Sequence, residues 1–117
     1  MEVTQKQKGG VMVCRVKGEI DIDTVPELKG KFREIVESKC RKVLLDFSGV
    51  KYIDSLGMVS LIGLSKDLKI FGGAVFLSNL SPKISSIFSI TGLEKVFKIY
   101  ETEEEALRNF GGDKGIK

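Results

Sequence analysis

The chain has 117 residues, of which 42% are hydrophobic, and a formal net charge of +3 at pH 7. This length is enough for one hydrophobic core and too short for two, so we expect a single domain. The chain contains no histidine, which excludes the Ser-His-Asp and Cys-His arrangements that activate a nucleophile and removes the commonest protein ligand for transition metals.

The chain opens with a predicted β-hairpin. Residues 3–7 and 11–17 are typical of two strands, and Lys8-Gly9-Gly10 supplies the turn between them. Gly18 is expected to end the second strand. Residues 19–23 are expected to form an acidic loop in which the two isoleucines, between the carboxylates, are buried.

The first helix is predicted over residues 24–39, where apolar residues recur at helical spacing. Thr24 is expected to be its N-cap, with Pro26 in the first turn. Glu27 would complete a capping box with Thr24.

The central stretch follows this helix. Residues 43–47 form an apolar, β-branched run that predicts a buried strand, which Ser48-Gly49 is expected to break before a brief second pass over residues 50–53. Asp54-Ser55 then stands directly before a helical pattern, so Ser55 is a candidate N-cap. A serine there has two readings: it caps the helix, or it is where a phosphate is attached, because a helix N-terminus stabilises an anion.

Two features near Ser55 favour the functional reading. The serine is framed by the apolar residues Ile53, Leu56 and Met58, so a partner could lay a complementary surface on it. Gly57 would let another backbone or an enzyme approach closely.

The remaining elements alternate regularly. They are a helix that ends near Gly72-Gly73, a strand over 74–77, a helix from Ser81-Pro82 to Gly92, a strand over 96–100, and a last helix that opens with a capping box at Thr102. The order β-β-α-β-α-β-α-β-α predicts a single-domain α/β fold. We expect a mixed central β-sheet, partly parallel after the hairpin and covered by helices.

Several function classes are disfavoured by what the chain does not contain. It has no basic block with aromatic neighbours, so a direct nucleic-acid partner is not expected. No apolar run approaches a membrane span and the first residues do not resemble a signal peptide, so we expect a cytoplasmic protein with no membrane contact. Cys14 and Cys40 are interpreted as small core residues.

One acidic group could imitate a metal cluster. Hydrated Mg²⁺ can be held by one or two carboxylates, and four acids precede predicted helices: Glu19, Asp21, Asp23 and Asp54. A metal-assisted phosphohydrolase on Asp21, Asp23 and Asp54 is one hypothesis. The alternative is a capped loop with solvated acids and no cofactor.

Four motifs in order resemble one known family. Gly18-Glu19-Ile20-Asp21 after the second strand, and residues 44–50 running into Ile53-Asp54-Ser55-Leu56-Gly57, resemble a STAS domain, specifically the stand-alone bacterial anti-sigma factor antagonists. Ser81-Pro82 with residues 90–97, and then Glu104-Glu105-Ala106-Leu107, are similar to later motifs of that family. The resemblance covers residues 3–110 and leaves 111–117 as an expected flexible C-terminal tail.

This resemblance implies a partner-switching mechanism. The unphosphorylated antagonist would bind an anti-sigma factor that is also a serine kinase, and so release a sigma factor. The kinase would inactivate it by phosphorylating Ser55, and a serine phosphatase of the PP2C type would reverse this. Such a protein is a substrate and a ligand, not an enzyme, and a monomer or weak dimer. The implied partner-binding residues are Asp21, Asp54, Ser55, Leu56, Gly57 and Met58.

Two positions depart from the family pattern. Leu56 stands where the family often has a second Ser or Thr, which leaves Ser55 as the only hydroxyl in the turn. Val59 stands where it often has another Gly, so partner choice is expected to differ. A STAS scaffold, a sensory or transport-complex adaptor, or a nucleotide-binding module is the alternative function.

Overall fold

The structure, a computed structural model, describes residues 1–115, with side chains over residues 1–110. The predicted order of elements is confirmed, with one short 3-10 helix added after the third helix. The elements are β1 (Glu2–Lys8), β2 (Val11–Ile20), α1 (Val25–Glu37), β3 (Lys42–Ile53), α2 (Ser55–Lys69), β4 (Ala74–Ser78), α3 (Pro82–Thr91), η1 (Leu93–Lys95), β5 (Lys98–Tyr100) and α4 (Glu103–Gly115).

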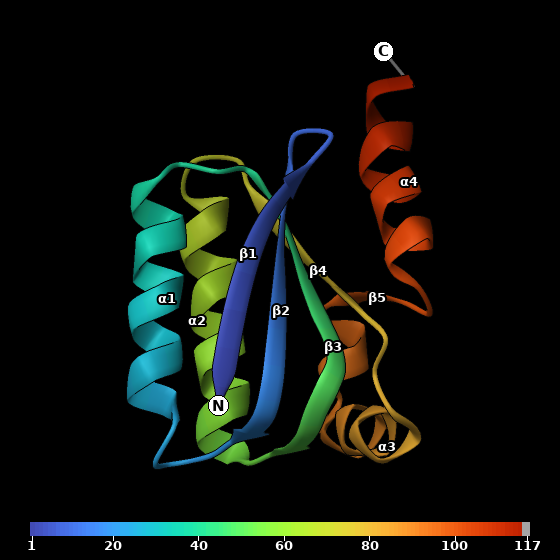
Figure 1. Ribbon diagram of the computed structural model, residues 1–117. Coiled ribbons are helices and arrows are strands. Elements are labelled where there is room, and N and C mark those ends of the chain that lie inside the picture. Colours follow the sequence, from blue (N-terminus) through green and yellow to red (C-terminus); the bar gives the residue numbers. More distant parts are fainter. Residues whose placement is uncertain (116–117) are drawn as a thin grey trace.

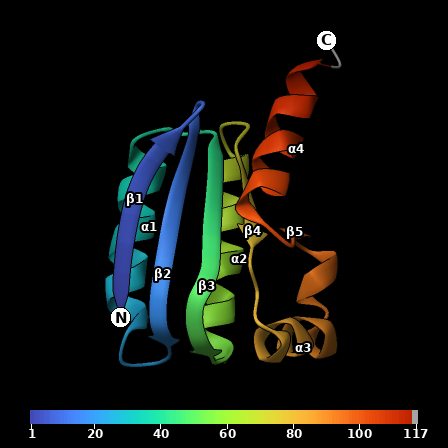
Figure 2. The same ribbon diagram turned by 45° about the vertical axis from the view of Figure 1, so that its right-hand side comes forward.

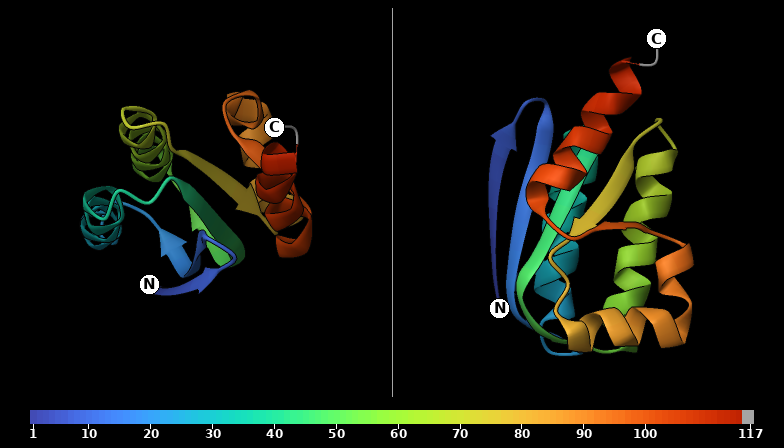
Figure 3. Two further views of the ribbon diagram at one scale, coloured as in Figure 1. Left: turned by 90° about the horizontal axis from the view of Figure 1, so that it is seen from above. Right: turned by 90° about the vertical axis from the view of Figure 1, so that its right-hand side faces the viewer.

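The five strands form one mixed sheet in the order β1-β2-β3-β4-β5. The pair β1–β2 is antiparallel and every later pair is parallel, as the alternation of strands and helices predicts. Helices α1 and α2 lie on one face, with α3 crossing one end of the sheet, and α4 lies on the other side (Figure 1; Figure 3). The sheet is therefore a central layer with helices on both faces.

Each face of the sheet has its own core. The larger core lies under α1, α2 and α3, and includes the edge-to-face pair of Phe47 and Phe88, whose ring centroids are 6.3 Å apart. The smaller core lies under α4, where Phe110 stacks on Phe76 with centroids 3.8 Å apart. Because α4 packs over β3, β4 and β5, the face above β1 stays open to solvent (Figure 2).

The central strand does not break at Ser48-Gly49, contrary to the sequence prediction. β3 runs through both residues, and its pairing with β2 shifts register twice, between Arg15 and Lys17 and between Gly18 and Glu19. Each shift places an extra β3 residue opposite β2, as in a β-bulge. Consequently Phe47, Val50 and Ile53 are all buried at a spacing of three, which alternation in a regular strand would not allow.

Other boundaries also differ from the prediction, for reasons of pairing. β2 continues through Gly18 to Ile20, because β3 pairs with it to the end. The last strand begins at Lys98, after the turn of η1. The predicted flexible tail at 111–117 stays a prediction, because the side chains of 111–115 and the whole of 116–117 lie outside the described residues.

The predicted helix caps are confirmed in three cases. Ser81 accepts a hydrogen bond from the Ile84 N–H, and Gly92 ends the same helix with a left-handed φ of 81°. Thr102 accepts a hydrogen bond from the Glu105 N–H at 3.1 Å. Thr24 occupies the predicted N-cap position but forms no capping box, because its hydroxyl bonds the preceding loop instead.

A polar cluster of two buried acids and two partly exposed bases holds the start of α4 on the sheet. Arg15 donates from Nε to Asp46 Oδ2 at 3.0 Å and from Nη2 to Glu103 Oε1 at 2.8 Å, and Lys8 forms an ion pair with Glu103. Burial alone would raise the pKa of Asp46, but the Ser48 backbone N–H and the Arg15 side chain outweigh it and lower that pKa. The hydrogen bond from Lys8 likewise lowers the pKa of Glu103, against a smaller opposing effect of burial.

The start of α2 lies very close to the ends of β2 and β3, and only glycine fits there. A Cβ on Gly57 would lie 2.6 Å from Ile20 Cγ2 and 2.8 Å from Ile53 Cγ1. Both isoleucines are buried. Further along the same helix, a Cβ on Gly63 would meet nothing within 4 Å.

The polar cluster predicts a specific loss of stability in acid. The folded-state pKa values of Asp46 and Glu103 are depressed. The contribution of these two acids to the free energy of unfolding is therefore fully present above their unfolded-state pKa values of about 4. It is lost as the pH falls through their folded-state pKa values. The urea midpoint of the parent should therefore fall between about pH 7 and about pH 3. Asp46→Asn should be less stable than the parent at neutral pH and should lose less on acidification, whereas Asp67→Asn, at an exposed acid, should follow the parent. Parallel curves for Asp46→Asn and the parent would contradict the role of the cluster.

The close contact at Gly57 predicts opposite effects for two alanine substitutions in α2. Gly57→Ala should destabilise the fold by about 1–3 kcal/mol, the usual cost of overpacking. Gly63→Ala should stabilise it by about 0.5–1 kcal/mol, because alanine loses less backbone entropy in a helix. Urea unfolding of both variants at neutral pH measures the difference, and equal effects would show that Gly57 is not sterically required.

Candidate functional site

The site is built around Asp54, the residue between β3 and α2. Its Oδ1 accepts a hydrogen bond from the Gly57 N–H at 3.0 Å, which caps α2, and its Oδ2 accepts one from the Ile22 N–H at 3.1 Å. The Asp54 N–H in turn donates to the Ile20 carbonyl oxygen at 3.0 Å. One residue therefore ties the end of β2, the following loop and the start of α2 together.

Ser55 is the first residue of α2 and not its N-cap, contrary to the sequence prediction. Asp54, in an extended conformation, takes the cap position and its carboxylate supplies the capping oxygen. The Ser55 side chain is exposed, and its hydroxyl makes no hydrogen bond to any residue within the described chain. A hydroxyl that is exposed, unbonded and at a helix N-terminus can accept a phosphate with little rearrangement.

The loop after β2 is held by its own hydrogen bonds. Asp21 Oδ1 accepts the N–H groups of Asp23 at 3.0 Å and Thr24 at 3.2 Å. Thr24 Oγ1 accepts the Asp21 N–H at 2.9 Å and donates to the Glu19 carbonyl oxygen at 2.8 Å. The half-buried Asp21 therefore shapes the loop that Asp54 joins to α2, which places both predicted acids at one edge of the sheet.

The surface next to Ser55 is apolar, but its members differ from those predicted. Ile22, expected to be buried, is 66% exposed, while its backbone N–H donates to Asp54 Oδ2. Leu56 is 44% exposed and Val59 60% exposed, each on the first turns of α2. We call Ile22, Leu56 and Val59 the apolar rim of the site. The signal in the sequence that favours an exposed Ile22 is its position between two acids in a loop.

The remaining predicted site residues point inward. Ile53 is buried and Met58 is half-buried, so neither frames Ser55 as an exposed apolar side chain. Gly57 is buried too, and the close approach it allows is to Ile20 and Ile53 of its own chain, not to an outside backbone. The role of Gly57 in the site is to allow the start of α2 to pack directly against the ends of β2 and β3.

The acidic residues do not converge on a metal site. The carboxylates of Asp21 and Asp54 accept backbone N–H groups, which matches the alternative of a capped loop. Over residues 1–110, whose side chains the structure describes, no group of three or more His, Cys, Asp or Glu could hold a metal ion. Nor is any described helix long and apolar enough to cross a membrane.

The two thiols lie away from this edge. Cys14 is buried in the larger core, where burial raises its pKa to about 12 and keeps the thiol neutral. Cys40 is half-buried, and its Sγ donates to the Lys42 carbonyl oxygen at 3.3 Å. For Cys14 the interpretation as a core residue is confirmed.

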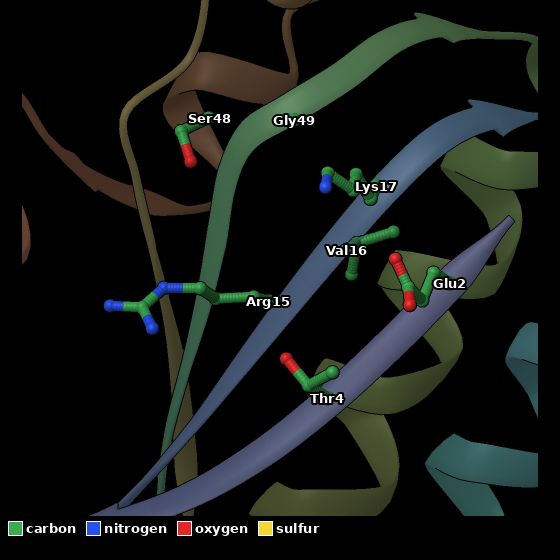
Figure 4. Close-up of a pocket in the computed structure, with 7 residues that line it drawn as sticks. All are labelled: Glu2, Thr4, Arg15, Val16, Lys17, Ser48 and Gly49. Carbon is green, nitrogen blue, oxygen red and sulfur yellow. The ribbon is translucent and has the colours of Figure 1, made fainter.

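A small hollow of about 170 Å³ lies on the open side of the sheet, and Ser55 does not line it (Figure 4). It is lined by Glu2, Thr4, Arg15, Val16, Lys17, Ser48 and Gly49. Its charges are of both signs, and the Arg15 guanidinium is already bonded to Asp46 and Glu103. It contains none of the predicted site residues.

Comparisons with known proteins identify relatives of this chain. The STAS domain family matches residues 2–106. The anti-sigma-B factor antagonist of Bacillus subtilis is 31% identical over 104 residues, which cover 89% of this chain and 94% of that protein. A solved anti-sigma factor antagonist from Mycobacterium paratuberculosis has 28% identity and a TM-score of 0.85, with 92% of each chain covered.

A further solved structure is SpoIIAA of Bacillus in its phosphorylated form. It has a TM-score of 0.71 and 23% identity, covering 93% of this chain and 99% of that one. An identity this low shows a shared fold alone. The family match over residues 2–106 and the identity with the Bacillus subtilis protein show the family as well as the fold. The chain belongs to the STAS domain family of anti-sigma factor antagonists.

Proposed function

We propose that this protein is a phosphorylation-controlled antagonist of an anti-sigma factor. In its unphosphorylated form it binds an anti-sigma factor that is also a serine kinase, and this binding frees a sigma factor. The kinase switches it off by phosphorylating Ser55, and a serine phosphatase of the PP2C type restores it. The observation that carries the proposal is the exposed, unbonded Ser55 hydroxyl at the first position of α2, beside an apolar rim.

The fold tolerates a phosphate on Ser55. The hydroxyl has no structural hydrogen bond to lose, since Asp54 already caps the helix. A phosphate adds about −1.5 to −2 charges at neutral pH, and the N-terminus of a helix stabilises negative charge. Phosphorylation should therefore leave the domain folded.

The same phosphate is unfavourable for a partner docked on the apolar rim. Burying a dianion against apolar surface costs its solvation, and Asp54 is a second anion directly beside it. Free antagonist competes for the kinase by mass action, so losing this affinity returns the kinase to the sigma factor. Phosphorylation thus dissociates the complex and leaves the protein folded.

The relatives support this assignment through their names. The Bacillus subtilis relative is an anti-sigma-B factor antagonist, and SpoIIAA exists in unphosphorylated and phosphorylated forms. We place the switch in the cytoplasm, where ATP and sigma factors are found.

The proposal predicts one phosphorylated residue. When the parent is incubated with ATP and each purified anti-sigma kinase of its genome, intact-mass spectrometry should show the addition of one phosphate, mapped to Ser55. Ser55→Ala should not be modified and should stay bound to the kinase in ATP, and Ser55→Glu should bind weakly. Ser86→Ala, at an exposed serine of α3, is the control and should behave like the parent. Phosphorylation of Ser55→Ala at the parent's rate would refute the site.

The apolar rim predicts a second set of effects. Ile22→Asp and Leu56→Asp should each weaken kinase binding by about tenfold or more, as expected for central interface residues. Both side chains are exposed, so thermal stability should change little. Ile90→Asp, at a side chain 85% exposed on α3, controls for adding a charge at an apolar surface position. Calorimetric titration measures all three, and equal losses for all three would mean that the rim has no special role.

A further inference from the structure

An open groove of about 470 Å³ runs between α1 and α2, on the outer side of the helix layer. Its floor includes the buried residues Phe32 and Leu64, and Val36 and Val59 form its sides. The two helices lie side by side along the sheet (Figure 3). Val59, already part of the apolar rim, is 60% exposed within this groove.

The stripe of α2 that lines the groove continues to Ser55. On α2, the residues Val59, Gly63 and Asp67 line it at a spacing of four, so they lie along one stripe of the helix. One turn earlier on that stripe is Ser55, at a further spacing of four. A molecule lying in the groove therefore reaches the proposed modification site at one end.

Gly63 keeps the groove open, and nothing inside the protein requires a glycine there. A Cβ at this position would meet nothing within 4 Å, and the residue lies in the middle of α2. Glycine is a poor helix former, so without another role this position favours a larger residue. A small residue on the lining of a groove is what a closely docked helix needs.

The charges along the groove are arranged by sign. α1 and α2 both follow strands that end at the same edge of the sheet, so they run in the same direction. On α1, Lys29 and Arg33 precede Glu37, and Asp67 is far along α2. The half of the groove nearer Ser55 is therefore basic, and the far half is acidic.

We propose that this groove binds an amphipathic helix of the same anti-sigma partner, which extends the interface beyond Ser55. The inference rests on the proposed function. The helix places its apolar side over Val36, Val59 and Gly63, its acidic residues toward Lys29 and Arg33, and its basic residues toward Glu37 and Asp67. A second copy of this chain fits less well, because two concave surfaces leave a void between them.

This arrangement gives the phosphate a second effect. The acidic end of the docked helix lies toward Ser55, so a phosphate there repels it while Lys29 and Arg33 attract it. Charge on Ser55 then weakens the groove contact as well as the contact at the rim.

The test fills the groove without touching Ser55. Gly63→Leu places a side chain on the groove lining, and Gly30→Leu is the matched control, since a Cβ at Gly30 also meets nothing within 4 Å and Gly30 does not line the groove. Both proteins should fold with thermal stability at least equal to the parent's. Calorimetric titration with the kinase that modifies Ser55 should show a loss of affinity of about tenfold or more for Gly63→Leu and none for Gly30→Leu.

A second variant tests the charge arrangement. Lys29→Glu with Arg33→Glu should slow association and reduce its dependence on salt, and Lys31→Glu, on the same helix but outside the groove, should not.

Parent-like binding by Gly63→Leu overturns the groove proposal and leaves the proposed function standing. Failure of the parent itself to bind any kinase overturns both. A parent dimer in sedimentation that Gly63→Leu makes monomeric assigns the groove to a second copy and overturns the partner helix.

Discussion

The position of the site depends on the two hydrogen bonds accepted by the Asp54 carboxylate. One fixes the first turn of α2 and the other fixes the loop after β2, although Ile22 in that loop lies 32 residues before Asp54 in sequence. The cap frees Ser55 from any structural role, and the bond to Ile22 holds a neighbouring backbone segment against the helix start. Under the proposed function, Asp54 carries the structural role and Ser55 the regulatory one, so a phosphate can be added to Ser55 without loss of the cap.

The packing of β2 and β3 against the start of α2 stabilises this arrangement. The two register shifts in β3 let Phe47, Val50 and Ile53 all face the larger core, and Ile53 leads directly into Asp54. Gly57 then allows α2 to start in contact with Ile20 and Ile53. Because α2 is fixed this closely at its start, its outer stripe from Val59 to Asp67 forms one wall of the groove, and α1 forms the other. The rim and the groove are thus consequences of the same packing.

Most of the fold could be predicted from the sequence, because it is encoded in local patterns. Helical spacing, the cap at Ser81 and the left-handed Gly92 each depend on a few adjacent residues. The errors occurred where distant segments decide. Asp54 and Ser55 are both good capping residues, so only the backbone conformation distinguishes them. Ile22 is exposed in a loop that is bonded to the distant Asp54, and the bulges of β3 belong to its pairing with β2.

The direction of α4 affects how this domain can be joined to others. α4 runs along the sheet and away from the edge where α2 begins, so its far end and Ser55 lie at opposite ends of the molecule (Figure 1; Figure 2). Met1, in contrast, lies beside Gly18, near the site's edge. A tether or fused module attached beyond α4 would leave the site and the groove accessible. A module attached at the N-terminus would compete for space with the proposed partner. The domain therefore has a permissive end and a restrictive end for fusion.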